Sequence, residues 1–429
     1  MTTPPRSSRR IRRAAAAVGV AAAVALALPA PAPAAAGTAA ATAPSGPAVK
    51  PDSGTWGTAA GGGGRAQLAT AVVEHGGRAY IGGSFTKMTP PGGGSGVTRN
   101  RLAAIDVARR KLLPWNPKAN GKVRALALNA SKTAVYVGGD FSSIGGKSAS
   151  KLALVDLASG KVDTKFRPAV KGRVRSIALA GNRLYVGGDF ESVGGKARPK
   201  VAALDPVTGK LLDWAPPPLG PGRYMGQTGV PTPDRPSGDV YSVAAPADGS
   251  RVYVAGTFID FAGQGGLVAL DADSGLPLPK QWSPGRPVFH LTVSPGDGRT
   301  VYAAAGGPGG RLYALDPDKP TKPRWQAAVD GDAVGVAASA TQVFLLGHYD
   351  YIVPKGSTCY QYCPNGTGRR HLAAFDAATG TLAPWNPAAN TSTGPWAATV
   401  SGTHLIVVGE FTTINGQRHP GYAQFPRKD

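Results

Sequence analysis

Short runs of apolar residues alternate with turn-forming residues through most of the chain. One stretch shows the whole pattern: residues 173–216 read RVRSIALAGNRLYVGGDFESVGGKARPKVAALDPVTGKLLDWAP. Its four apolar runs lie at residues 174–180, 184–188, 201–204 and 211–214, and Gly, Asn, Asp and Pro separate them. Runs of this length, rich in β-branched and aromatic residues, predict strands joined by hairpins. The stretch therefore predicts a four-stranded antiparallel sheet, whose strands we call a to d.

Strand b of this unit recurs seven times, together with the residues that follow it. The copies are AYIGGSF (79–85), VYVGGDF (135–141), LYVGGDF (184–190), VYVAGTF (252–258), VYAAAGG (301–307), VFLLGHY (343–349) and IVVGEF (406–411). Strand c recurs in six clear copies that end in aspartate, with a degenerate seventh copy at residues 421–425. A sheet with two apolar faces must be covered on both, and radial stacking of such sheets gives a β-propeller. We therefore expect an all-β, seven-bladed β-propeller of four-stranded antiparallel blades.

The seventh repeat lacks a strand d, because the chain ends at Asp429 soon after the last strand c. Trp56 lies ahead of the first repeat, where the end of a preceding strand d would fall. We expect an N-terminal strand around Trp56 to complete the last blade, since closing the ring in this way removes the open sheet edges. The predicted propeller spans residues 56–429.

Residues 1–36 follow a different pattern, which predicts an export signal. Five arginines precede an apolar run at residues 14–28, and prolines and Ala34-Ala35-Ala36 follow it. This order is typical of a signal peptide, and the apolar run is too short for a membrane span. We expect cleavage near Ala36 and a secreted, extracellular protein without a transmembrane anchor; the general secretory and twin-arginine routes both remain open. Residues 37–55, rich in small residues and proline, predict a flexible linker.

Two residue types recur at fixed places and predict structural roles. An aspartate ends strand c, where its carboxylate can cap the backbone N–H groups of the following turn. The members are Asp106, Asp156, Asp205, Asp271, Asp316 and Asp376. An aromatic residue ends strand d, where a large flat side chain suits packing between blades. The members are Trp115, Phe166, Trp214, Trp282, Trp325 and Trp385, with Trp56 ahead of the first repeat.

The repeats resemble two known groups of proteins. GGDFSSIGG at residues 138–146 and GGDFESVGG at residues 187–195 resemble the delta-60 type repeats of a family of bacterial extracellular β-propellers. VAALDPVTGKLLDW at residues 201–214 is similar to the docking repeat of quinoprotein-like propellers. The chain is thus distantly similar to quinoprotein-like and WD40-like propellers. The resemblance covers residues 56–425 and implies a propeller without a defined activity. It does not carry a quinone cofactor, because the chain has no adjacent pair of cysteines, and we expect no cofactor.

Three carboxylates occupy the same place after strand b: Asp140, Asp189 and Glu410 each precede a phenylalanine. In a propeller the b-to-c and d-to-a connections emerge on one face, so these side chains are expected on one rim. They either cap the glycine-rich loop or bind a cation or a sugar. Oxygen ligands suit calcium, but no dense run of them is present. We favour capping and predict no metal site.

Three long insertions interrupt the repeats, at residues 86–101, 215–239 and 350–370. The strand assignment places all three on the same face as the rim carboxylates. Loops on one face of a rigid scaffold often carry function, although long loops without a ligand also occur. Tyrosine rings stack on sugars and arginine pairs with anionic groups. The candidate ligand-binding residues are Arg223, Tyr224, Tyr351, Tyr360, Tyr362, Arg369 and Arg370.

The third insertion contains the two cysteines of the chain, Cys359 and Cys363. In an exported protein such a pair predicts a disulfide that constrains its loop. The alternative is a zinc site that uses His348 or His371, which requires reduced thiols.

The positive net charge of the chain favours one class of binding partner. The net charge is +22, and without the five arginines of the export signal it is +17 for residues 37–429. So basic an exported chain favours anionic surfaces. The cationic residues are spread over the repeats without a nucleic-acid recognition motif, so we expect no specific nucleic-acid binding.

Common enzyme motifs are absent from the sequence, including GxSxG, HExxH and a phosphate loop. We assign no catalytic residue and expect a monomeric binding module for an anionic polysaccharide or a cell-wall polymer. One alternative is a glycan-active hydrolase or lyase with two rim carboxylates roughly 5 to 10 Å apart. A second alternative is a non-catalytic scaffold that binds another protein.

Overall fold

The computed structural model describes residues 46–59, 67–198, 200–220, 222–225, 231–235, 238–259, 264–307, 309–357, 359 and 362–427. The chain divides into two units, residues 1–42 and 43–429, and all described residues belong to the second. The predicted export signal and residues 37–45 of the predicted linker lie outside the described residues. The elements of the described part are all strands, and no helix there is long and apolar enough to cross a membrane. The all-β class that the apolar runs predict is confirmed.

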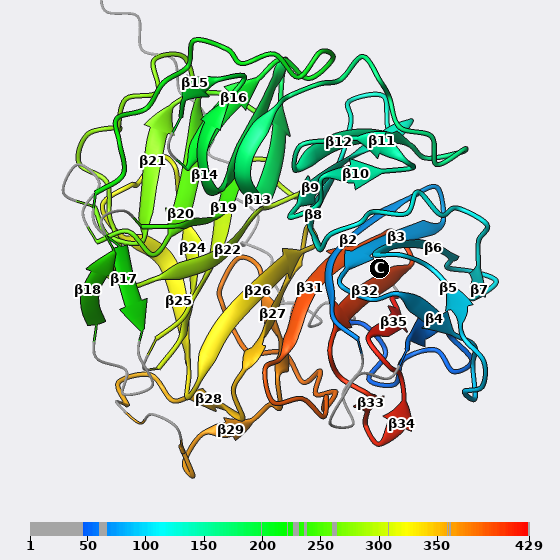
Figure 1. The fold of residues 1–429 in the computed structure, drawn as a ribbon. Helices are drawn as coiled ribbons and strands as arrows, with labels where there is room; N and C mark the ends of the chain where they lie inside the picture. Colours follow the sequence, from blue (N-terminus) through cyan, green and yellow to red (C-terminus); the bar gives the residue numbers. More distant parts are fainter. Residues whose placement is uncertain are drawn as a thin grey trace, which may run out of the picture. The chain divides into compact units, whose positions relative to one another are not determined.

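Seven sheets in the described part share one antiparallel order, in which strand b lies between strands a and c (Figure 1). The a strands are β2 (Ala69–His75), β8 (Val123–Leu128), β13 (Val170–Ala180), β19 (Val240–Ala244), β22 (Val288–Val293), β26 (Asp332–Ala338) and β31 (Pro395–Val400). The b strands are β3 (Arg78–Gly83), β9 (Ala134–Gly139), β14 (Arg183–Val193), β20 (Arg251–Gly256), β23 (Val301–Ala305), β27 (Gln342–His348) and β32 (His404–Gly409). The c strands are β6 (Leu102–Asp106), β12 (Leu152–Asp156), β16 (Val201–Leu204), β21 (Leu267–Asp271), β24 (Arg311–Leu315), β30 (Leu372–Asp376) and β35 (Tyr422–Pro426). The predicted b and c strands of every repeat are thus present.

The outermost strand d is shorter than the four-stranded prediction requires. It is a strand in two sheets, as β7 (Lys111–Leu112) and β25 (Pro323–Val329). In four other sheets a single bridge, such as Val155 with Val162, joins strand c to the outer segment. The segments at these places contain proline and aspartate, as in LLDWAPPP, and such residues interrupt a ladder of backbone hydrogen bonds. Most sheets therefore have three long strands and a bridged outer segment, instead of the four full strands that the sequence predicts.

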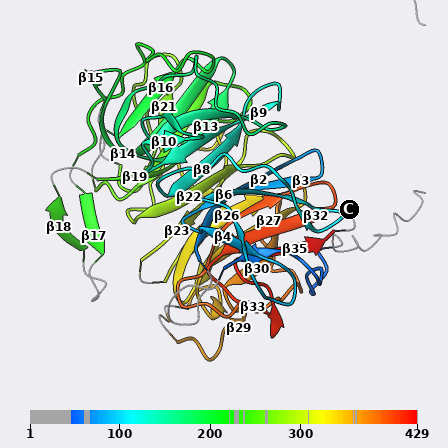
Figure 2. The ribbon, with the colours of Figure 1, turned by 45° about the vertical axis from the view of Figure 1, so that its right-hand side comes forward.

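Smaller elements fill the connections between these strands. Two-stranded hairpins are formed by β10 (Ser143–Ile144) with β11 (Lys147–Ser148), by β33 (Thr413–Ile414) with β34 (Gln417–Arg418), and by β17 (Gly222–Met225) with β18 (Pro231–Arg235). β15 (Lys196–Ala197) pairs with β14, and β28 (Tyr351–Val353) with β29 (Thr367–Gly368) extends the sheet of β25. β1 (Gly57–Thr58) pairs with β4 (Lys87–Thr89), and β4 pairs with β5 (Val97–Thr98). In Figure 2, β17 and β18 lie apart from the seven repeat sheets.

The a strands contact one another in a cyclic order. β2 contacts β8, and contacts continue through β13, β19, β22 and β26 to β31, which in turn contacts β2 (Figure 1). Apolar clusters fill the spaces between neighbouring sheets; one joins Tyr80 and Trp115 of the first repeat to Val135 and Val137 of the second. The core is therefore divided among interfaces between successive sheets.

Close packing explains the Gly-Gly pair that ends several b strands. A Cβ atom on Gly138 would lie 2.6 Å from Cγ1 of Val174 in the next sheet, and one on Gly139 would lie 2.1 Å from the carbonyl oxygen of Lys122. Neither position has room for a side chain. Phe141, which follows after one residue, is fully buried and anchors the exit of the strand.

Residues 47–52 lie along β35. The backbone N–H groups of Ala48 and Asp52 donate to the carbonyl oxygens of Pro426 and Gln424, at 2.7 and 2.9 Å. The structured unit therefore begins ahead of residue 56, within the segment that the sequence assigns to a flexible linker. This segment is held in place because the side-chain amide of Gln424 is buried and donates a hydrogen bond to the carboxylate of Asp52. Trp56 packs, partly buried, against the neighbouring apolar cluster, and the adjacent β1 pairs with β4 rather than with β35.

Candidate functional site

Each a strand carries a β-bulge, which lies within the first three residues of six of them and at the middle of β13. The register of the a strand with the b strand shifts across a single residue, for example between Ala69 and Ala71 and between Val123 and Ala125. The residues at the seven bulges are Thr70, Arg124, Arg175, Tyr241, Phe289, Val334 and Trp396. A bulge changes the direction of a side chain, and all seven line one cavity of about 510 Å³.

We call this cavity the inner-strand pocket. Its other lining residues are Leu68, Lys122, His290, Asp332, His348, Ser392 and Thr393. They come from the beginnings of the a strands, from the connections just before them, and from the end of β27. The pocket therefore lies at the ends of the strands where the d-to-a and b-to-c connections also lie.

Ion pairs hold the cations of the second and third repeats. The guanidinium of Arg124 donates from Nε and Nη2 to the two oxygens of Asp140, both at 2.7 Å. Lys200 Nζ lies 2.5 Å from Asp189 Oδ1 and 3.5 Å from Asp239 Oδ1. Burial opposes ionisation of Asp140 and of Asp189, but the hydrogen bonds and charges of their cationic partners outweigh it and lower the pKa of both carboxyl groups. Instead of capping a glycine-rich loop, as the sequence suggests, these two carboxylates position basic side chains.

Glu410, the third rim carboxylate, accepts a hydrogen bond from the hydroxyl of Thr393. Thr393 itself lines the inner-strand pocket. The three carboxylates are thus placed near the ends of the a strands, but each is engaged by a side chain of its own sheet or of a neighbouring connection.

Lys122 stands at the cationic side of the pocket. Burial, together with the charges of Arg124 and Arg175, lowers its pKa to about 8, while Asp140 acts in the opposite direction. The amine is therefore still largely protonated at neutral pH. Among the described residues, no side chain or carbonyl oxygen accepts a hydrogen bond from its ammonium group.

Aromatic side chains follow the cations around the pocket. The guanidinium of Arg175 lies 4.7 Å from the centroid of the Tyr241 ring, and Tyr241 meets Phe289 edge to face at 5.2 Å. The indole N–H of Trp396 is buried and has no hydrogen-bond partner among the described residues. His290 Nδ1 accepts from the backbone N–H of Val336 at 3.3 Å, and burial lowers the pKa of this imidazole to about 4.

A second cavity, of about 480 Å³, lies beside the third insertion; we call it the loop pocket. Its lining residues are Asp350, Tyr351, Tyr362, Gly368, Arg370, Asn386 and Ala388. The rings of Tyr351 and Tyr362 are perpendicular, with centroids 6.1 Å apart, and Tyr362 is 67% exposed. Arg370 Nε lies 4.0 Å from Asp350 Oδ1.

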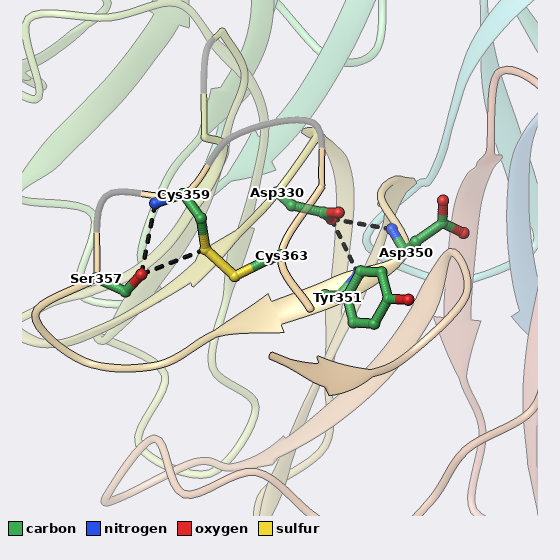
Figure 3. Close-up of a disulfide and its surroundings, with 6 residues drawn as sticks. All are labelled: Asp330, Asp350, Tyr351, Ser357, Cys359 and Cys363. Carbon is green, nitrogen blue, oxygen red and sulfur yellow. Dashed lines mark hydrogen bonds between the residues drawn. A yellow bond between two sulfur atoms is a disulfide. The ribbon is translucent and has the colours of Figure 1, made fainter. Parts of the chain in front are cut away.

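Two features shape the insertion that carries these tyrosines (Figure 3). Asp330 Oδ1 accepts the backbone N–H groups of Asp350 and Tyr351, at 3.0 and 2.9 Å. Cys359 and Cys363 form a disulfide with their Cα atoms 5.5 Å apart. The disulfide prediction is confirmed, and the sulfur atoms are not free thiolates for zinc. The rings of His348 and His371 stack at 6.0 Å, and no group of three or more His, Cys, Asp or Glu side chains in the described part could hold a metal ion.

The structure separates the seven candidate ligand-binding residues. Tyr351, Tyr362 and Arg370 come together in the loop pocket. Arg369 is buried and donates to the carbonyl oxygens of Gly368 and Ala383, so its place is structural. Arg223 and Tyr224 lie in β17, whose side chains are not described, and Tyr360 lies outside the described residues.

The recurring residues of the repeats are placed at contacts between sheets and within turns. The indole N–H groups of Trp115, Trp214, Trp325 and Trp385 donate to the carbonyl oxygens of Asp156, Asp271, Ala377 and Ala48, at 3.0 to 3.2 Å. Trp282 packs against Tyr313 with ring centroids 4.7 Å apart. Asp205 shows the turn chemistry, because its Oδ1 accepts the backbone N–H and the hydroxyl of Thr208, both at 2.7 Å. These hydrogen bonds lower the pKa of Asp205.

The inner-strand pocket is the part of the site that the repeat pattern does not reveal. Its seven bulge residues differ in nearly every repeat, so they form no motif. The available signal is an arginine inside an otherwise apolar run, at Arg124 in VRALAL and at Arg175 in RVRSIALA. A charge at that place in a buried strand indicates a residue turned toward a polar space.

A family model matches a large part of the chain. No curated protein matches the chain. The family model described as outer membrane protein assembly factor BamB matches residues 148–408, a span that includes the docking-type repeat at residues 201–214. The match agrees with the quinoprotein-like resemblance and does not test the delta-60 type resemblance. Because it covers more than half of the sequence, the chain belongs to the family of outer membrane protein assembly factor BamB and contains its quinoprotein-like β-propeller repeat.

Proposed function

We propose that the chain is a secreted binding module, built as a closed seven-bladed β-propeller, that binds a carbohydrate or an anionic cell-wall polymer through its loop pocket. Two observations support the ring: the a strands contact one another in cyclic order, and the segment containing Ala48 and Asp52 is hydrogen-bonded along β35. In this arrangement the N-terminal segment supplies the missing outer strand of the last blade. The outer edge of the last blade is then covered by a segment of the same chain.

The residues that line the loop pocket are the main support for a carbohydrate or anionic ligand. Tyr351 and Tyr362 offer two perpendicular ring faces, and sugar rings present C–H groups that pack against such faces. Arg370, Asp350 and Asn386 add donors and acceptors for hydroxyl or acidic groups. The disulfide and the two hydrogen bonds to Asp330 restrict the insertion, which lowers the entropy lost when a ligand binds.

The alternative of a glycan-active enzyme is less well supported. Glycoside hydrolysis generally needs two carboxyl groups that face one substrate. Among the described lining residues, Asp350 is the carboxylate of the loop pocket and Asp332 that of the inner-strand pocket. Of the rim carboxylates, Asp140 and Asp189 are engaged by basic side chains. A binding module therefore fits the arrangement better than a hydrolase or a lyase.

Affinity electrophoresis of the secreted chain tests the proposal, with gels that contain polygalacturonate, hyaluronate, soluble peptidoglycan or neutral dextran. We expect retardation by at least one acidic glycan, and weaker retardation at higher salt because the ion pair with Arg370 is screened. Tyr362→Ala should reduce retention by about 3- to 10-fold, the effect of one lost aromatic contact. Leu276→Ala, which truncates another exposed apolar side chain, is the matched control.

Retention that is equal for Tyr362→Ala and wild type would contradict the assignment of the loop pocket. Release of new reducing ends or unsaturated sugars would favour the enzyme alternative. Absence of retention in every gel would favour the scaffold alternative. N-terminal sequencing of the protein from the culture medium tests export, with a start just after Ala36 as the expected result.

A further inference from the structure

The wall of the inner-strand pocket changes character from one side to the other. Following the contact order of the a strands, β8 and β13 contribute Arg124 and Arg175, and Lys122 lies just before β8. The next four strands, β19, β22, β26 and β31, contribute the large or apolar residues Tyr241, Phe289, Val334 and Trp396. Cations thus gather on two adjacent strands, and a mainly apolar arc occupies the strands that follow. Asp332 at the start of β26 also lines this arc, where its Oδ1 accepts the backbone N–H of Gly307 at 2.7 Å.

The cationic side has more positive than negative charges. Five basic side chains, Lys122, Arg124, Arg173, Arg175 and Lys200, share three carboxylates, Asp140, Asp189 and Asp239. The ion pairs fix the guanidinium of Arg124 and that of Arg175, whereas the ammonium of Lys122 has no hydrogen-bond acceptor among the described residues. An excess of charge in a partly buried space favours an anion, since an anion would relieve the repulsion between the cations.

Each side of the pocket has a buried hydrogen-bond donor that lacks an acceptor in the described part of the chain. The Nε1–H of Trp396 is buried and without an acceptor in the described part of the chain, and so is the Nε–H of Arg175. Buried donors are rarely left unpaired, because the cost of removing such a group from water is then not compensated. A carboxylate bound beside Arg175 would offer acceptors to its guanidinium.

The size of the cavity sets the size of its ligand. A volume of about 510 Å³ lies within the range of small-molecule sites, roughly 300 to 1,000 Å³. We propose that the inner-strand pocket binds a small organic anion, with its acidic group against Lys122 and Arg175 and its apolar body against Tyr241, Phe289 and Trp396. This site shares no lining residue with the loop pocket, so it stands apart from the proposed glycan binding.

Isothermal titration calorimetry on the full secreted chain tests this site with matched probes. The probes are 1-naphthoate, which has both an anionic group and an apolar body, 1-naphthalenemethanol, which has the same body without the charge, and inorganic phosphate, which has only the charge. We expect saturable binding of one 1-naphthoate per chain, at least about tenfold tighter than either other probe. Quenching of tryptophan fluorescence should follow the same isotherm. Equal affinity for the alcohol, equal affinity for phosphate, or no binding of 1-naphthoate would each overturn the proposal.

Three variants assign the binding to this pocket. Lys122→Gln and Trp396→Leu should each weaken 1-naphthoate by about tenfold or more, the first through the lost charge and the second through the lost aromatic ring. Lys147→Gln, which removes an exposed lysine from the same repeat, should leave the affinity unchanged. If Lys122→Gln and Lys147→Gln bind 1-naphthoate alike, the pocket is not its site.

Acylation of the wild-type protein gives a readout that does not depend on how the variants fold. Limited treatment with acetic anhydride at pH 8, followed by mass spectrometry, should modify Lys122. Saturating 1-naphthoate should reduce that modification at least fivefold, with Lys147 unaffected. Equal acylation of Lys122 with and without 1-naphthoate would refute its place in the binding site.

Discussion

Asp52 provides the sharpest test of how the N-terminal segment is held. Its carboxylate accepts a hydrogen bond from Nε2 of Gln424 at 2.6 Å and lies 3.1 Å from Nε2 of His404. Gln424 is fully buried, and its Nε2 also donates to the carbonyl oxygen of Val107 at 2.9 Å. Replacement of Asp52 by alanine therefore removes one of two acceptors from a buried amide. It leaves the backbone hydrogen bonds of the segment in place.

The expected loss follows from these contacts. A hydrogen bond to a charged group contributes about 1.5 to 3 kcal/mol, and the contact with His404, which is nearer the surface, adds less. We expect Asp52→Ala to lower the free energy of unfolding by about 2 to 3 kcal/mol. Asp163 is a matched control, because its backbone is held in the same way. The N–H of Asp163 donates to the carbonyl oxygen of Leu154, the third residue of β12, and that of Asp52 donates to the carbonyl oxygen of Gln424, the third residue of β35. The carboxylate of Asp163 caps only the backbone N–H of Lys165, so Asp163→Ala should cost about 1 kcal/mol or less.

Urea unfolding measures the free energies, and hydrogen exchange locates the change. In Asp52→Ala the amides of Ala48 and Asp52 should exchange faster, whereas those of the second repeat should not change. Equal destabilisation by the two substitutions, or unchanged exchange at Ala48, would refute the reasoning that the carboxylate anchors this segment to the last repeat.

Three further predictions concern other parts of the molecule. Burial lowers the pKa of the His290 imidazole to about 4 in the folded protein, against about 6.5 in the unfolded chain. The unfolded chain therefore takes up the proton first as the pH falls. The free energy of unfolding should decrease by up to about 3 kcal/mol between pH 6.5 and pH 4. His290→Asn, which keeps an acceptor for Val336, should lack this part of the loss in urea unfolding at each pH, and identical pH profiles would exclude it. Gly139→Ala should lower the free energy of unfolding by more than about 2 kcal/mol, because the new Cβ would clash with the carbonyl oxygen of Lys122. Gly146→Ala should lower it by about 1 kcal/mol, because the new Cβ has no atom within 4 Å and only the positive φ opposes it. Binding of 1-naphthoate should weaken as pH rises through about 8, because Lys122, which faces Arg124, Arg175 and Asp140, then loses its charge. Lys122→Gln should show no such step in calorimetry.

The repeats could be predicted from the sequence because each strand b and strand c buries the same kinds of side chain. The apolar runs placed β9 and β12 correctly, and the aspartate and tryptophan positions followed from turn chemistry and from packing between sheets. The outer strands were less predictable. Whether a segment such as LLDW forms a full ladder depends on its partner as well as on its own residues.

The pockets were harder to predict, for two physical reasons. A β-bulge depends on the register between two strands, so no property of Arg175 or Trp396 alone indicates that the side chain turns toward a cavity. The convergence of Tyr351, Tyr362 and Arg370 depends on how one insertion folds back on itself. The disulfide could be expected from the cysteine pair, whereas the burial of Arg369 beside the exposed Arg370 could not.

The seven bulges also affect how the sequence of such a protein can change during evolution. Each places one side chain in a common space without involving that side chain in the ladder of its own sheet. Substitutions there can alter what the molecule accepts while the scaffold keeps its stability. A library that varies only these seven positions would separate recognition from folding, and related chains are expected to differ most where Thr70, Tyr241 and Val334 stand here.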